Sequence, residues 1–282
     1  MNMNIFNQCI ILTGACFFFF SGCVVPLKVP LPTGSTQAPQ IDFVRLLELA
    51  EAAGHAYETD ATIESVYGKS NVVIRDFSDL NIRYFIFFNK SKRTQTISIR
   101  GTANKSNAWA DIDSLKVLDI RLNIFLHKGF KLAADQIYAD AGPYLHKKYK
   151  TRLTGHSLGG AVASILMMNM IHDGYQIEQA LTFGQPKITN ENGGTEFNTA
   201  PYFRIINGQD LVPQVPPSNL LYDFSGPYQH FGPEITLLAD KKWTFSPVHN
   251  PKDLLTNGNW KQLDLENGTD HQIKNYIERL KS

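Results

Sequence analysis

Cysteine is absent from residues 24–282 of this chain, because all three of its cysteines lie at Cys9, Cys16 and Cys23. The remainder can therefore form no disulfide and no cysteine-ligated metal site, so its stability has to come from packing. The histidines are scattered and give no ligand cluster at the usual spacing for zinc. We accordingly expect no metal and no other cofactor.

The chain also lacks a surplus of either charge, since 27 Lys and Arg face 26 Asp and Glu and the net charge is +1. A protein that binds nucleic acid through phosphate contacts carries a basic patch or a basic surplus. Neither is visible here, and the balance gives no reason for tight docking on anionic membranes. No internal repeat and no long charge run is present. We expect no nucleic-acid partner and predict no protein partner.

Charged side chains are missing from the first 22 residues, which contain an apolar run from Cys9 to Phe20. This pattern is typical of a signal peptide. The small residues Ser21 and Gly22 directly before Cys23 resemble the lipobox of bacterial lipoproteins. That resemblance implies cleavage before Cys23 and acylation of its thiol and new amino terminus.

Two features of this leader depart from the lipobox pattern: Phe20 stands where Leu is usual, and no Lys or Arg precedes the apolar run. An uncleaved anchor is the alternative, since the run extended to Val25 reaches the short limit for spanning a bilayer. Either way we expect an exported protein tethered to the cell envelope, most simply at the outer membrane. Residues 23–40 carry four prolines and predict an extended spacer, which leaves 41–282 for one folded domain.

Apolar residues recur at two kinds of spacing in residues 41–282. Spacings of three and four predict amphipathic helices, whereas short β-branched and aromatic runs predict strands. Helices are predicted over 42–56 and from about Gly129 to Pro143, and strands over 82–88, 94–100, 177–183 and 202–206. The first two strands flank a polar turn and predict a hairpin. Strands alternating with helices predict an α/β domain with an antiparallel portion in its sheet.

The hexapeptide Gly155 to Gly160 has the form Gly-His-Ser-Leu-Gly-Gly and lies between a strand-like run, 149–154, and a helix-like run, 161–171. A strand, a sharp turn and a helix in that order form a nucleophile elbow, which exposes a serine hydroxyl at the carboxyl edge of a sheet. The alternative is a glycine-rich helix start without chemistry. The context favours Ser157 as a nucleophile.

A serine nucleophile needs a histidine base and usually a carboxylate that orients it. Asp210 has the best context among later carboxylates because it follows the strand at 202–206, although it could simply cap a turn. Three histidines follow: His230, His249 and His271. His271 is favoured because an amphipathic terminal helix anchors its segment, His249 lies in a polar loop, and His230 is the real competitor.

Two neighbours of these residues are predicted to be structural. His156 should point away from the Ser157 hydroxyl across the turn, and Asp270 most simply caps the last helix.

An acyl-transfer site also needs donors for the developing oxyanion. Leu158 N–H, directly after the nucleophile, is one expected donor, and Thr102, after an early strand, is placed to be the second. Thr102 could equally be an ordinary strand-end residue.

Six segments, which include the candidate residues above, follow one another along the chain. They are Ile99 to Thr102, His127 to Phe130, Gly155 to Gly160, Thr182 to Pro186, Asp210 to Pro213, and Asp270-His271 with Tyr276. In this order they resemble the class 3, fungal-lipase-like family from about residue 42 onward. The resemblance implies a single-domain α/β-hydrolase fold with a mixed, mostly parallel central sheet flanked by helices. It also implies Ser157, Asp210 and His271 as the triad, and Thr102 with Leu158 as the oxyanion hole.

The same resemblance implies that His230, in a His-x-Gly-x-Glu pattern ending at Glu234, is structural. Residues 103–113 could form a lid, or Trp109 could simply pack in the core. We therefore expect an exported serine carboxylester hydrolase that cleaves acylglycerols through an acyl-enzyme, with lipid esters as its substrate partners. A phospholipase A1 activity and a catalytically silent lipid-binding protein are the alternatives.

Overall fold

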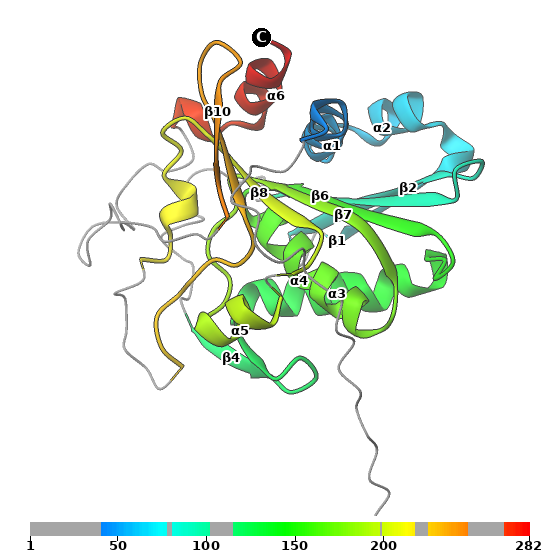
Figure 1. Ribbon diagram of the computed structural model, residues 1–282. Helices are drawn as coiled ribbons and strands as arrows, with labels where there is room; N and C mark the ends of the chain where they lie inside the picture. Colours follow the sequence, from blue (N-terminus) through cyan, green and yellow to red (C-terminus); the bar gives the residue numbers. More distant parts are fainter. Residues whose placement is uncertain (1–40, 78–80, 102–114, 198, 218–224, 248–267) are drawn as a thin grey trace, which may run out of the picture. The chain divides into compact units, whose positions relative to one another are not determined.

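The central sheet is mixed and is formed by strands in the order β1-β2-β3-β6-β7-β8-β9-β10 (Figure 1). The computed structural model describes residues 41–77, 81–101, 115–197, 199–217, 225–247 and 268–282. The strands of this sheet are β1 (Val72–Phe77), β2 (Ile82–Asn89), β3 (Thr94–Ile99), β6 (Lys150–His156), β7 (Gln176–Phe183), β8 (Tyr202–Asn207), β9 (Glu234–Leu237) and β10 (Trp243–Ser246).

Strands β3, β6, β7, β8 and β9 are parallel, so their carboxyl ends lie at one edge of the sheet. Antiparallel pairs flank them: β1 and β2 pair with each other and β2 with β3, while β10 pairs with β9. The hairpin predicted over 82–100 is β2-β3, in which Tyr84 pairs with Ile99. The prediction of a mixed, mostly parallel α/β sheet is confirmed.

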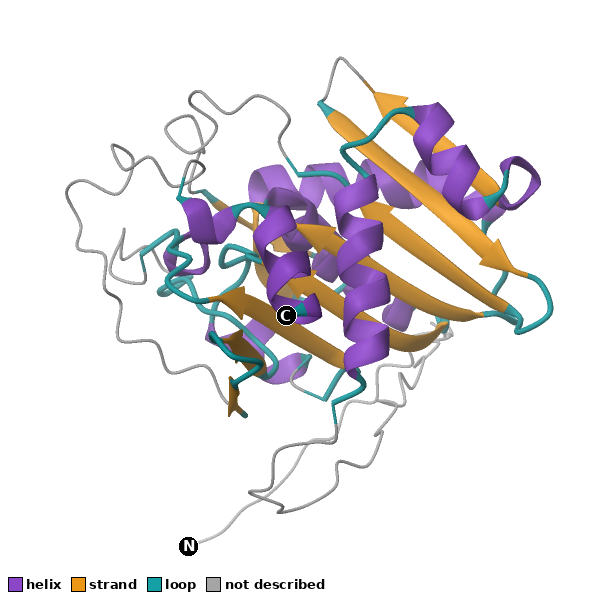
Figure 2. Ribbon diagram, turned by 90° about the horizontal axis from the view of Figure 1, so that it is seen from above, coloured by secondary structure: helices purple, strands orange, loops and turns teal. Residues whose placement is uncertain are grey.

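Helices cover both faces of the sheet (Figure 2). Helices α3 and α4 pack with the strands into one apolar core, and α1 and α6 pack with β7, β8 and β9 into a second. The helices are α1 (Phe43–His55), α2 (Asp60–Tyr67), α3 (Lys128–Ala141), α4 (Leu158–His172), α5 (Glu191–Glu196) and α6 (Ile273–Lys281). The helices expected at 42–56 and from Gly129 are α1 and α3.

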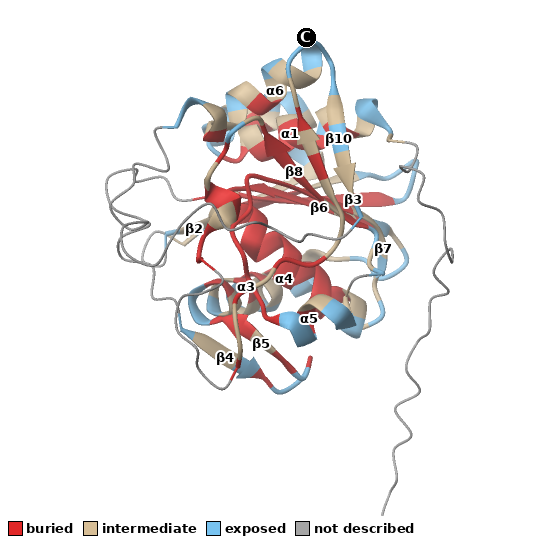
Figure 3. Cartoon of the chain, turned by 60° about the vertical axis from the view of Figure 1, so that its left-hand side comes forward, coloured by how far each residue is buried: buried red, intermediate tan, exposed pale blue. Residues whose placement is uncertain are grey.

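Helix α4 is buried almost all round, as its uniformly apolar sequence predicts (Figure 3). It lies between α3 and strands β6 and β7. Buried side chains such as Ile165, Leu166 and Met168 each contribute about 1.5–3 kcal/mol of transfer free energy. The helix that starts at the elbow is therefore fixed by packing along its whole length.

Several short elements were not anticipated from the sequence. The hairpin β4 (Lys116–Asp119) and β5 (Ile124–His127) forms a separate two-stranded sheet, and helix α2, strands β1, β9 and β10, and helix α5 complete the fold. Strands of four residues give too few positions for an alternating pattern to emerge. In the described part of the chain, no helix combines the length and apolar character needed to cross a bilayer.

Some predictions concern residues outside the described ranges. These are the leader at 1–22, Cys23 and the spacer at 23–40, the oxyanion residue Thr102, the lid segment at 103–113 and His249.

Candidate active site

Ser157 occupies a sharp turn between β6, which ends at His156, and α4, which begins at Leu158. Its backbone has φ 59° and ψ −129°. A positive φ is unfavourable for a residue with a side chain, so surrounding contacts have to maintain this conformation. Side chains at Gly155 and Gly159 would collide with backbone atoms of the facing segments. The glycines of the motif thus allow the close packing that forces the serine into this strained turn.

Three side chains predicted to act together form one hydrogen-bonded line. The Nε2 atom of His271 lies 2.9 Å from Ser157 Oγ, and its Nδ1 atom lies 2.8 Å from Asp210 Oδ2. All three residues are at least 94% buried, with exposed fractions of 4–6%. Because Asp210 Oδ2 accepts a hydrogen bond from Nδ1, the neutral imidazole carries its proton on Nδ1 and presents the lone pair of Nε2 to the serine hydroxyl.

Asp210 is held by two further donors. Its Oδ1 accepts the backbone N–H of Val212 at 2.9 Å, and its Oδ2 accepts the hydroxyl of Tyr276, which is fully buried in α6. Burial alone would raise the pKa of Asp210, but the charge of His271 and hydrogen bonds from His271, Tyr276 and Val212 outweigh it and hold the pKa below its usual value. Asp210 is therefore a carboxylate at neutral pH.

The pKa of Tyr276 moves in the opposite direction. Burial raises it well above its usual value, and the negative charge of Asp210 raises it further. Tyr276 thus remains a protonated donor toward Asp210. Tyr276 was one of the residues that carried the resemblance to the class 3 family. No local sequence pattern indicated its hydrogen bond to Asp210.

His271 lies in a 3₁₀ turn, Thr269–His271, directly before α6. The expectation that Asp270 caps the last helix is wrong, because α6 follows Gln272 and has no side-chain cap. Instead, Asp270 Oδ2 accepts the N–H of Gln209 at 2.7 Å, and its carbonyl accepts the Asn207 side-chain amide at 2.9 Å. The carboxylate and the carbonyl of Asp270 thus each accept a hydrogen bond from the segment that leads to Asp210. Backbone and amide donors near a protein core need such acceptors. Asp270 therefore fastens the His271 turn to the end of β8.

The other histidines in the described ranges have different partners. His230 is buried, and its Nε2–H donates to the carbonyl of Pro213 at 2.7 Å. Near it, Arg204 forms an ion pair with Glu234 at 3.1 Å and donates to the carbonyl of Phe231. The two nitrogens of His156 are engaged by Tyr57 and by the His271 carbonyl, so its ring does not face the Ser157 hydroxyl.

Leu158 is the first residue of α4, so its N–H belongs to the helical turn that lacks intrahelical acceptors. The positive end of the helix dipole reinforces such donors toward an oxyanion. Gly101, which precedes Thr102, donates its N–H to the hydroxyl of Tyr57 at 3.1 Å. A Cβ at Gly101 would lie 2.7 Å from the His156 carbonyl oxygen and 3.3 Å from Ser157 Cβ, so the segment after β3 lies beside the elbow.

Gly184, directly after β7, leaves the space in which the Asp210–His271 pair sits. A Cβ at this position would lie 2.7 Å from Asp210 Oδ2, 2.9 Å from His271 Nδ1 and 2.9 Å from the Tyr276 hydroxyl. Its φ of +59° is also unfavourable for any other residue. No sequence pattern indicated this role.

We expect Gly184→Ala to reduce kcat more than tenfold and to destabilise the fold by at least about 1–2 kcal/mol, the cost of the left-handed conformation alone. Gly174 provides a matched control because its φ is +78° and a Cβ there would contact nothing within 4 Å. Gly174→Ala should therefore lose stability without losing activity. Urea unfolding and ester hydrolysis of both variants measure the difference; equal activities would refute a role for Gly184 at the site.

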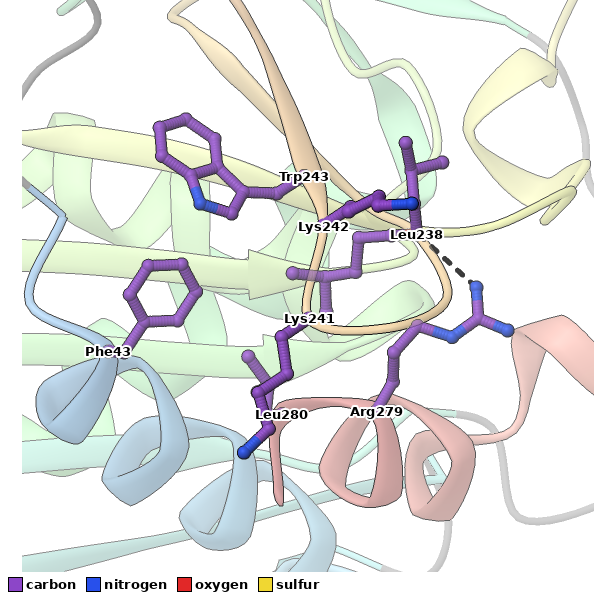
Figure 4. Close-up of a pocket in the computed structure, with 8 residues that line it drawn as sticks. Phe43, Leu238, Lys241, Lys242, Trp243, Arg279 and Leu280 are labelled. Atoms are coloured by element: carbon purple, nitrogen blue, oxygen red, sulfur yellow. Dashed lines mark hydrogen bonds between the residues drawn. The ribbon is translucent and has the colours of Figure 1, made fainter. Parts of the chain in front are cut away.

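A separate pocket of about 310 Å³ lies between the start of α1, the β9-β10 hairpin and α6 (Figure 4). Its lining combines apolar side chains, such as Phe43, Trp243 and Leu280, with Lys241, Lys242 and Arg279. Arg279 donates to the carbonyl of Leu237 at 3.2 Å. Ser157, Asp210 and His271 do not line this pocket.

Comparison with known proteins finds similarity to lipases. Residues 96–220 match the family model described as lipase (class 3). Secreted mono- and diacylglycerol lipase 1 of Fusarium solani is 28% identical over 177 residues, which cover 58% of this chain and 51% of that protein. Phospholipase A1-II 1 of Oryza sativa subsp. indica is 34% identical over 79 residues, which cover 26% of this chain and 20% of that protein.

The structure of lipase II from Rhizopus niveus superposes with a TM-score of 0.62 at 21% identity, covering 75% of this chain and 88% of that chain. This likeness shows that the fold is that of the α/β-hydrolases. The chain spans about half of the length of the Fusarium protein. The elbow and Asp210 both lie within residues 96–220, the segment that matches the lipase (class 3) family model.

Proposed function

We propose that this chain is a serine carboxylester hydrolase that cleaves acylglycerols. The observation that carries the proposal is the buried hydrogen-bonded line from Ser157 through His271 to Asp210. A lipid-binding protein without catalysis has no use for a serine at a strained elbow that faces a base and its orienting carboxylate. This arrangement favours an enzyme over a silent lipid-binding protein.

In the proposed reaction, Ser157 Oγ attacks the ester carbonyl carbon while His271 Nε2 accepts the hydroxyl proton. The tetrahedral oxyanion receives hydrogen bonds from Leu158 N–H and from Thr102. It collapses to an acyl-enzyme, and His271 gives its proton to the departing alcohol. Water then attacks the acyl-enzyme in the same way, releasing the fatty acid and restoring Ser157.

Asp210 takes no proton in this scheme. It holds His271 in the tautomer that can accept from serine, and it stabilises the imidazolium that forms. The Tyr276 hydroxyl and the Val212 N–H keep the carboxylate in place and ionised.

The choice of acylglycerols is supported by the name of the Fusarium relative, a mono- and diacylglycerol lipase. The second candidate, a phospholipase A1, is supported by the match to the rice protein of that name. Both reactions release a fatty acid from a glycerol ester by the same chemistry. They differ in whether a phosphate headgroup has to be accommodated.

The test compares a triacylglycerol emulsion, a diacylglycerol and phosphatidylcholine vesicles as substrates of the full chain, with Ser157→Ala as the blank. Serine-dependent release from glycerides supports the proposal. Release from phospholipid alone makes the chain a phospholipase A1. A wild-type rate equal to the blank on all three substrates and on a soluble short-chain ester would contradict hydrolase activity.

Export and lipid attachment at Cys23 belong to the same proposal, with the cell envelope, most simply the outer membrane, as the location. A relative named as secreted supports export, and the Ser-Gly-Cys sequence supports attachment. We expect Cys23→Ala to abolish incorporation of a labelled fatty acid when the chain is expressed in a bacterium. Cys16→Ala is the matched control, since the proposed cleavage removes that residue. Label retained by Cys23→Ala, or a mature terminus elsewhere by intact mass, would refute the attachment site.

A further inference from the structure

An unbroken line of hydrogen bonds passes through His156, the residue before the elbow serine. The backbone N–H of Gly101 lies 3.1 Å from the hydroxyl oxygen of Tyr57. That oxygen lies 3.0 Å from Nδ1 of His156, and Nε2 of His156 lies 2.6 Å from the backbone carbonyl oxygen of His271. Four segments that are distant in sequence thus meet in one chain of three bonds.

The two ends of this line fix the direction of every bond in it. A backbone N–H can only donate, so Gly101 donates to Tyr57. A carbonyl can only accept, so the Nε2 of His156 carries a proton and donates to His271. In the neutral ring Nδ1 is then an acceptor, and it receives the Tyr57 hydroxyl proton. One tautomer of His156 satisfies the whole line.

The line connects parts of the candidate site that have to keep a fixed relation during catalysis. Gly101 lies against the elbow, since a Cβ added there would approach Ser157 Cβ to 3.3 Å. It is also the residue before Thr102, the proposed oxyanion donor. At the other end, the carbonyl that His156 holds belongs to the base itself. The rings of His156 and His271 lie at a centroid distance of 4.6 Å.

We propose that Tyr57 and His156 are positioning residues, which fix the backbone of His271 and the end of β3 relative to Ser157. This inference rests on the proposed hydrolase function. Within these bonds, Tyr57 is connected to the elbow through Gly101 and to His271 through His156. Small displacements of reacting groups have large effects on rate, about 100-fold for 1 Å.

The charge state of His156 fits this role. Its burial lowers its pKa to about 3, and the nearby charge of His271 contributes in the same direction, against smaller opposite effects of the His271 carbonyl and Asp210. A protonated His156 would point a second N–H at Tyr57 and deprive that hydroxyl of its acceptor. A neutral His156 also avoids repulsion when His271 becomes an imidazolium.

The test is Tyr57→Phe in the full chain, which removes one hydroxyl and keeps the ring. We expect kcat on a soluble short-chain ester to fall about 10- to 100-fold, with KM changed less than about twofold because ground-state binding is retained. Titration with a phosphonate that labels Ser157 measures the concentration of active sites, so that kcat can be expressed per folded active site. Tyr84→Phe is the control, because this buried hydroxyl donates to Asp140 at 2.6 Å away from the line.

A double-mutant cycle tests whether the two residues act as one unit. His156→Leu should reduce kcat at least as far as Tyr57→Phe, and the double variant should be no slower than His156→Leu alone. His156→Gln retains a donor for the His271 carbonyl and should recover part of the loss. Additive effects of Tyr57→Phe and His156→Leu would overturn the proposal.

Nitrogen NMR of His156 gives a readout that is independent of activity. The wild type should show a protonated Nε2 and an unprotonated, hydrogen-bonded Nδ1, and the Nδ1 signal should shift in Tyr57→Phe. The opposite tautomer would overturn the proposal even in an active enzyme. A kcat of Tyr57→Phe equal to that of the wild type, with only the melting temperature lowered as in Tyr84→Phe, would also overturn it. A wild type that hydrolyses no ester refutes the proposed function, and the NMR result then stands separately.

Discussion

His271→Asn is expected to reduce kcat by about six orders of magnitude. A loss of about this size follows when a serine hydrolase loses its nucleophile or its base. The Nε2 of His271 is the only group within hydrogen-bond distance of Ser157 Oγ among the described side chains. An Asn side chain is shorter and has no lone pair that could take a proton at neutral pH. The serine hydroxyl would then have to attack without a base.

His230→Asn distinguishes a lost base from general damage to the fold. His230 is as buried as His271, with exposed fractions of 5% and 4%, and its Nε2 is engaged by the Pro213 carbonyl. Its replacement should cost about 0.5–1.5 kcal/mol of unfolding free energy for the lost hydrogen bond, while kcat per folded molecule stays near that of the wild type. Thermal melts and steady-state rates of both variants provide the comparison; the reverse pattern would make His230 the base.

The sequence predicted the parts of the site that carry a strong local signal. The glycines around Ser157 and the uniformly apolar helix after it are consecutive in the chain, so the elbow could be predicted from a short window. The prediction of Asp210 and His271 depended on the order of elements along the chain. Asp210 follows a recognisable strand, and His271 precedes a recognisable helix. Their distances to each other came only from the folded structure.

The contacts that were missed join residues far apart in sequence. The Tyr57–His156 hydrogen bond spans 99 positions, and it exists because α1 packs against β6. The space left by Gly184 depends on Asp210, His271 and Tyr276 converging on it from two other segments. Asp270 was assigned to the nearest helix, but its carboxylate reaches back 61 positions to Gln209. The local preferences of residues for helix, strand or turn do not predict contacts between segments that are distant in sequence.

Asp210→Asn is expected to lower kcat by about four orders of magnitude, the effect of leaving a catalytic histidine in the wrong tautomer. The Asn carbonyl would accept the Val212 N–H that now reaches Oδ1, which turns the amide NH₂ toward His271 Nδ1. Facing a donor, Nδ1 must become an acceptor, so the proton moves to Nε2. An Nε2–H cannot accept the serine proton. The fold is retained because Asn has nearly the shape of Asp.

The pH dependence of stability provides a second measurement for this variant. The pKa of Asp210 in the folded chain lies below its usual value of 3.8, so the ionised form favours folding. That stabilisation is fully present above the usual value and is lost as pH falls through the lower folded pKa. Asn does not titrate. The difference in unfolding free energy between wild type and Asp210→Asn should therefore be constant near neutral pH. It should become smaller in acid, because only the wild type loses the stabilisation that ionised Asp210 provides. Urea unfolding from pH 7 to the acid limit measures it, and a difference that increases as pH falls would show that Asp210 is buried in its protonated form and cannot orient the base.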